Sequence, residues 1–79
     1  MDRQTIQRHL QRAEIHIFEA KQLVARQREM VAELEKYEHD LEAARNLLVV
    51  FEEISAMQVA HRGQLQRELA EALANESTQ

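Results

Sequence analysis

Four histidines, His9, His16, His39 and His61, are the side chains of this sequence best suited to chemistry, because a neutral imidazole is a common metal ligand. His9 and His16 are seven residues apart and share one face of a helix. If the chain folds back on itself, His61 comes close to His16. Zinc sites, however, take three or four ligands from Cys, His and carboxylate side chains, and this pattern supplies two. We therefore expect no bound metal, with a site at His16 and His61 as the alternative.

A small metal-binding or ferritin-like helical protein is the functional class behind that alternative. Ferritin-like proteins carry a Glu-x-x-His motif on the core face of their helices. The nearest spacings in this sequence are His16 with Glu19 and Glu35 with His39, and neither is that motif. Histidines from two chains could converge in the core between two hairpins. The simpler interpretation is that His61 is a polar member of an apolar stripe.

No nucleophile, general base or phosphate-binding loop stands out in the sequence. The hydroxyl side chains lie in no motif of nucleophilic catalysis; they are Thr5, Tyr37, Ser55, Ser77 and Thr78. A single glycine cannot form a glycine-rich phosphate loop. Two long helices also leave no concave pocket that excludes water. We therefore expect neither enzymatic activity nor a cofactor.

The charge of the chain argues against nucleic acid as a partner. Fourteen acidic and ten basic side chains give a formal net charge of −4, which opposes attraction to a phosphate backbone or an anionic lipid surface. The arginines near the N-terminus alternate with glutamates such as Glu14 and Glu19, and Phe18 is the only aromatic residue among them. Nucleic-acid binding is not expected.

Composition favours helix almost throughout. The chain has 79 residues, 44% of them apolar and 4% aromatic, with no proline and one glycine, and this composition is typical of an all-α protein. It has no cysteine, so it has neither a disulfide framework nor thiol chemistry. The longest apolar run, Leu47–Phe51, is far shorter than a membrane span, and no signal peptide is evident. We expect a cytoplasmic protein that does not enter the membrane.

Two apolar stripes, and the break between them, define the elements that position these residues. The first stripe has the alternating four–three spacing of a coiled-coil seam; it contains Ile6, Leu10, Ala13, Ile17, Ala20, Val24, Gln27, Val31 and Leu34. The second contains Leu47, Phe51, Ile54, Gln58, His61, Leu65, Leu69 and Ala72. On one straight helix the two stripes would face nearly opposite sides. The chain is therefore expected to reverse direction between them.

The reversal is expected at the segment Tyr37-Glu38-His39-Asp40. Asp40 is suited to cap the second helix, and Asp2 the first. The predicted fold class is all-α, an antiparallel two-helix hairpin with a coiled-coil-like seam in one domain. The predicted boundaries within residues 1–79 are a helix at about 3–37, a turn at about 38–40, a helix at about 41–74 and a polar tail at 75–79.

Closing the hairpin at this turn sets the register of the two helices. Glu14 and Arg62 then lie opposite each other at the edge of the seam, so we predict a salt bridge between them. Charge is uneven along the hairpin: residues 29–53, around the turn, hold eight acidic and two basic side chains, and the open end holds six acidic and eight basic. We interpret the acidic end as a solvated surface, with docking of a basic partner as the alternative.

The side chains that flank the seam predict self-association. On one flank they are apolar, and the interface residues we predict there are Leu23, Met30, Tyr37, Val50 and Met57. A two-helix layer cannot cover that side itself, and helices with such a wide apolar face are typical of bundles. We expect a homodimer that forms a four-helix bundle, in a parallel or an antiparallel arrangement; a partner helix from another protein is the alternative. The predicted function is that of a non-enzymatic structural or protein–protein interaction module.

Two stretches of the sequence carry a resemblance to known proteins. RHLQRAEIHI and RQREMVAELEKYEHDLEAARNLLVVFEE resemble segments of short, uncharacterised helical-hairpin proteins of alphaproteobacteria, over about residues 8–70. In such proteins the turn often resembles Gly-His-Asp, and Glu38 stands here in the place of that glycine. The resemblance implies a bacterial, cytoplasmic helical hairpin and brings no catalytic residue or activity with it.

Overall fold

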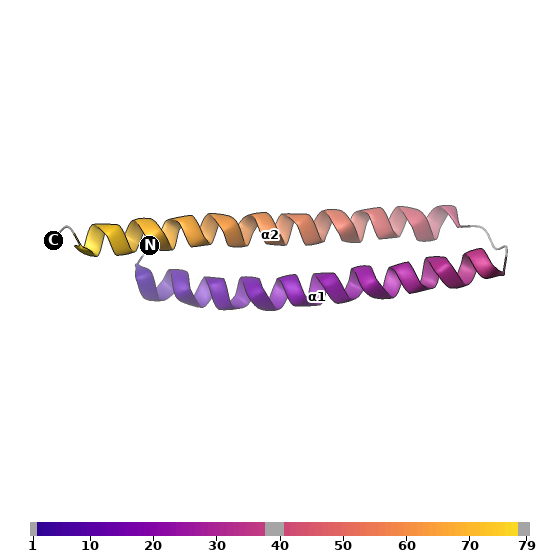
Figure 1. The fold of residues 1–79 in the computed structure, drawn as a ribbon, viewed down its shortest axis with the longest axis horizontal. Helices are drawn as coiled ribbons and strands as arrows, with labels where there is room; N and C mark the ends of the chain where they lie inside the picture. Colours follow the sequence, from indigo (N-terminus) through magenta and orange to yellow (C-terminus); the bar gives the residue numbers. More distant parts are fainter. Residues whose placement is uncertain (1, 38–40, 78–79) are drawn as a thin grey trace.

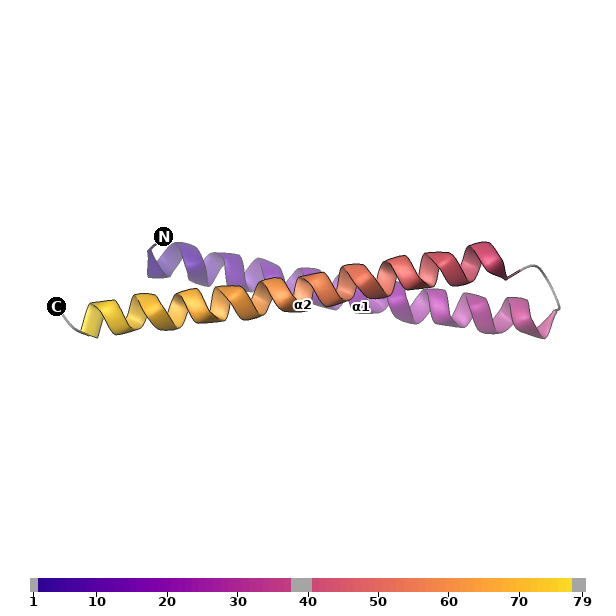
Figure 2. The same ribbon diagram turned by 90° about the horizontal axis from the view of Figure 1, so that it is seen from above.

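The computed structural model describes residues 2–37 and 41–77 and contains two long helices, α1 (Arg3–Lys36) and α2 (Glu42–Ser77). The helices pack against each other in opposite directions, so that the start of α1 and the end of α2 lie at one end of the molecule (Figure 1). Figure 2 shows that they cross at a shallow angle. The molecule measures 65 × 15 × 13 Å. The predicted all-α, two-helix hairpin is confirmed.

Asp2 caps the N-terminus of α1, as its residue type predicts. Its backbone is extended, and its carboxylate accepts a hydrogen bond of 2.8 Å from the backbone N–H of Thr5, one of the donors that the first helical turn leaves unpaired. Hydrogen bonding to Thr5 holds the pKa of Asp2 below its ordinary value of 3.8, because these bonds favour the charged form.

We expect the start of α1 to fray at low pH because of this cap. Since the folded-state pKa of Asp2 is lowered, the cap's contribution is fully present above the ordinary value and is lost as pH falls through the folded-state pKa. NMR chemical shifts of Thr5 should report the loss. In the Asp2→Asn variant, whose side chain caps without ionising in this range, the same titration should leave Thr5 unchanged. An equal response in both variants would contradict the assignment.

The other helix ends differ in part from the predicted boundaries. Helix α1 ends at Lys36 with Tyr37 as its C-terminal cap, and the predicted cap Asp40 lies outside the described residues. Helix α2 continues to Ser77, beyond the expected end near residue 74. Two contacts account for the extra turn: Ser77 Oγ donates to the Leu73 carbonyl at 3.0 Å, and Glu76 pairs with Arg3 of α1 at 3.1 Å.

The seam of α1 is confirmed. Its buried side chains follow the predicted four–three spacing; they are Ile6, Ala13, Ile17, Ala20, Val24, Gln27 and Val31. The remaining two members of the stripe, Leu10 and Leu34, are half-buried. Gln27 is the one buried polar residue in the part of the chain that the structure describes, and its amide donates a 2.9 Å hydrogen bond to the Ala44 carbonyl of α2. A buried amide with a single partner across the seam favours one register of the two helices.

The seam of α2 differs from the prediction over its first half. Leu65 is its buried residue, and its half-buried seam residues are Leu41, Ala44, Leu48, Phe51, Ser55, Gln58, Arg62, Leu69 and Ala72. Three predicted members, Leu47, Ile54 and His61, are exposed instead, so the prediction was wrong at those positions. The physical reason is that a coiled-coil seam needs an unbroken alternation of four- and three-residue steps. The predicted stripe had two successive steps of four around Leu65, whereas the observed seam keeps the alternation throughout.

Gly63 makes no close approach to α1. A Cβ atom at this position would meet only the guanidinium of Arg67, at 3.6 Å, which is an ordinary contact. We therefore expect Gly63→Ala to stabilise the protein by about 0.5–1 kcal/mol through its higher helix propensity. Urea denaturation monitored by circular dichroism measures this change. A loss of stability would show that the glycine is needed for packing.

Candidate functional site

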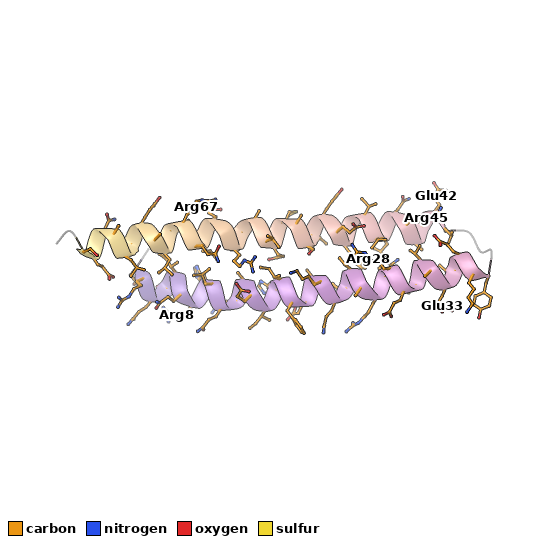
Figure 3. The ribbon with its side chains drawn as sticks, viewed as in Figure 1. Arg8, Arg28, Glu33, Glu42, Arg45 and Arg67 are labelled. Carbon is orange, nitrogen blue, oxygen red and sulfur yellow. The ribbon has the colours of Figure 1, made fainter. Side chains whose placement is uncertain are left out.

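Among the described residues, four ion pairs connect the two helices and report their register. They are Arg3–Glu76, Glu14–Arg62, Arg28–Glu52 and Glu35–Arg45, with distances of 3.1 to 3.7 Å. Figure 3 labels Arg28 and Arg45, one from each helix, in the half of the hairpin nearer the turn. The predicted pair of Glu14 with Arg62 is confirmed at 3.4 Å, although Arg62 lies in the seam rather than beside it.

We expect this ion pair to contribute little to stability. Both side chains reach solvent, and exposed pairs contribute about 0–1 kcal/mol and weaken as salt screens the charges. A double-mutant cycle with Glu14→Gln and Arg62→Gln should therefore give a coupling free energy of unfolding below about 1 kcal/mol. A larger coupling that persists in high salt would contradict this description of an exposed pair.

One side of the hairpin is apolar, and we call it the apolar face. It consists of Leu23, Met30, Tyr37, Leu47, Val50, Ile54 and Met57, all exposed. The most exposed are Met57, at 67%, and Tyr37, at 64%. In α1 the members directly precede seam residues such as Val24 and Val31. In the observed register the members from α2 lie on the same side of the seam, so the two helices form one surface.

All five predicted interface residues belong to the apolar face. They are Leu23, Met30, Tyr37, Val50 and Met57. The sequence analysis missed Leu47 and Ile54 because it assigned them to the seam. The apolar run Leu47–Phe51 is the signal that could have identified them. Leu47 and Leu48 are adjacent, so only one of the two can face α1 and the other must lie outside the seam. With both added, the face is wider than predicted and bridges the two helices.

The other exposed apolar side chains are scattered. They are Ile15, Phe18, Val49, Val59 and Leu73, and they lie on the outer sides of the helices or on the opposite flank of the seam. Isolated exposed apolar residues are common on soluble proteins, whereas a contiguous group marks an interaction site. The apolar face is therefore the candidate functional site.

The histidines of the open end gather beside the apolar face. A hollow of about 430 Å³ has Ala13 and Leu65 as its buried floor. The other residues that line it are His9, Arg12, His16, His61, Gln64 and Glu68. The structure therefore brings His16 and His61 to one site. Among the described residues, no three His, Asp or Glu side chains are placed to hold a metal ion.

Within residues 2–37 and 41–77, neither helix has a stretch apolar and long enough to cross a membrane. Every buried polar side-chain atom in this part of the chain has a hydrogen-bond partner.

Comparisons with protein-family models, with curated proteins and with solved structures gave no match to this chain.

Proposed function

We propose that this protein is a non-enzymatic structural or interaction module that associates with a second copy of itself through the apolar face. The observation that carries the proposal is the concentration of seven exposed apolar side chains on one side of the hairpin, next to a seam that buries only seven apolar residues and Gln27 among the described residues. As part of the same proposal, the module acts in the cytoplasm of a bacterial cell, as the resemblance implies.

The small core of the hairpin supports self-association. Ordering a residue costs about 1–2 kcal/mol of backbone entropy alone, and a two-helix layer buries too little apolar surface to offset this cost over its whole length. Burial of an exposed Leu, Ile or Met side chain contributes about 1.5–3 kcal/mol. The apolar face holds the additional burial that the fold needs, and a second helical layer would supply it.

A second copy is the simplest occupant of the apolar face. A two-fold dimer pairs the same patch on both chains, and a patch of Leu, Ile, Val and Met side chains is complementary to itself. Two hairpins joined in this way form a four-helix bundle, in which apolar side chains beside the seam become part of the core. A helix from another protein is the competing occupant, and in its absence the isolated chain would be a weakly folded monomer.

Thermal unfolding at several protein concentrations tests the proposal. If folding is coupled to association, the Tm rises with concentration, because mass action favours the dimer. We expect the Tm, measured by circular dichroism, to increase as the chain concentration is raised from micromolar to hundreds of micromolar. A sharp transition with the same Tm at every concentration would show that the chain folds as a monomer and would reject the proposal.

A further inference from the structure

We propose that the two copies lie antiparallel, with Tyr37 of each chain seated in the histidine-lined hollow of its partner. This inference rests on the proposed self-association and adds the direction and register of the dimer. The two-fold axis would run across the hairpins, within the interface, so that α1 lies over α1 of the partner in the opposite direction.

The position of the apolar face along the hairpin sets the register. Measured along α1, its non-aromatic members extend from the part of α1 that lies opposite Met57 to Met30. The midpoint of this span is near Ala25. A two-fold axis at this level superimposes the apolar faces of the two chains and buries the most apolar surface. Any axis nearer the middle of the hairpin would place apolar side chains against the charged open end.

This axis brings Tyr37 opposite the hollow. Tyr37 follows Ala25 by twelve residues, and Ala13, on the floor of the hollow, precedes Ala25 by twelve, so each lies about 18 Å from the axis along α1. Tyr37 is 64% exposed in the single chain, and its ring would pack on Ala13 and Leu65 of the partner. Its hydroxyl would meet polar side chains of the rim, which is how tyrosine is used at interfaces.

Charge favours the antiparallel over the parallel dimer. Residues 29–53, around the turn, carry eight acidic and two basic side chains, a net charge of −6, and the remainder carries six acidic and eight basic, a net charge of +2. In Figure 3, Glu33 and Glu42 lie at the turn end and Arg8 lies toward the open end. A parallel dimer would set the two acidic segments side by side over their whole length, whereas in the antiparallel dimer they meet only at their inner ends and the two turns lie at opposite ends of the bundle, which lowers the repulsion.

Distances between spin labels on the two chains test the direction. The chain has no cysteine, so single labels can be attached to Lys36→Cys or Arg8→Cys, two exposed positions on the outer side of α1. Along the bundle we expect about 33 Å between two labels at position 36, about 50 Å between two at position 8, and about 10 Å between position 8 of one chain and 36 of the other. In a parallel dimer the mixed distance would be the longest of the three, and that order would overturn the inference.

Substitutions at position 37 test the packing of Tyr37 in the hollow of the partner. Tyr37→Ala should weaken the dimer about tenfold or more, and Tyr37→Phe should retain most of the affinity. Phe18→Ala is the matched control, because Phe18 is nearly as exposed, at 62%, on the outer side of the same helix; it should leave the dissociation constant unchanged. Equal effects of Tyr37→Ala and Phe18→Ala on the dissociation constant would reject the packing of Tyr37 in the hollow. A monomeric parent chain would instead reject the proposed function, so the two failures are distinguishable.

Discussion

The Ile54→Glu variant is expected to be monomeric at concentrations at which the parent chain is a dimer. Ile54 lies near the middle of the apolar face, and a two-fold dimer contains the substitution twice. Each chain would lose burial of the part of Ile54 that is exposed in the single chain, about 0.5–1 kcal/mol, and would place an unpaired carboxylate in a dry interface. The dissociation constant should therefore rise by at least ~100-fold, measurable by size-exclusion chromatography with light scattering.

Val59→Glu is the control for this substitution. Val59 has the same exposed fraction as Ile54, 38%, and lies on the same helix, but it points to the opposite flank of the seam. The variant should remain a dimer, since it adds the same charge outside the apolar face. If both glutamates dissociate the dimer, or if neither does, the apolar face is not the interface.

The Leu65→Ala variant is expected to lose about 2–5 kcal/mol of stability, because it removes a buried side chain and leaves a cavity that the helices only partly close. Leu65 is 3% exposed and is the buried apolar residue that the structure places in α2. It packs at the level of Ala13, a small residue with no side chain able to fill the space. Urea denaturation at fixed protein concentration measures the loss.

Leu73→Ala is the matched control for the core. The same atoms are deleted from the same helix, but Leu73 is 41% exposed, so the free energy of unfolding should change by less than about 1 kcal/mol. A loss at Leu73 as large as the loss at Leu65 would mean that the seam does not run where the structure places it.

The fold could be predicted from the sequence because two signals agreed. The four–three spacing of α1 is unbroken from Ile6 to Leu34. Its buried positions include small residues such as Ala13 and Ala20, which are covered only if a neighbouring helix packs closely against them. The phase difference between the two stripes required a reversal of the chain. Neither signal depends on details of side-chain packing.

The register of α2 could not be predicted from periodicity alone. Its first turns carry apolar side chains at adjacent positions, so two stripes one residue apart, through Leu47 and Ile54 or through Leu48 and Ser55, both have helical spacing. In the structure the stripe through Leu48 and Ser55 forms the seam. In this register Arg62 pairs with Glu14, and Gln27 donates a hydrogen bond to the Ala44 carbonyl. The same ambiguity made the apolar face seem narrower in the sequence than it is in the structure.

Self-association is the central claim, and sedimentation equilibrium of the purified chain tests it most directly, because it measures mass without reference to shape. For a chain of 9.3 kDa, we predict that the mass at micromolar concentration is twice that of the monomer and returns toward 9.3 kDa in the Ile54→Glu variant. A well-folded parent chain that sediments as a 9.3 kDa monomer under these conditions would contradict the account.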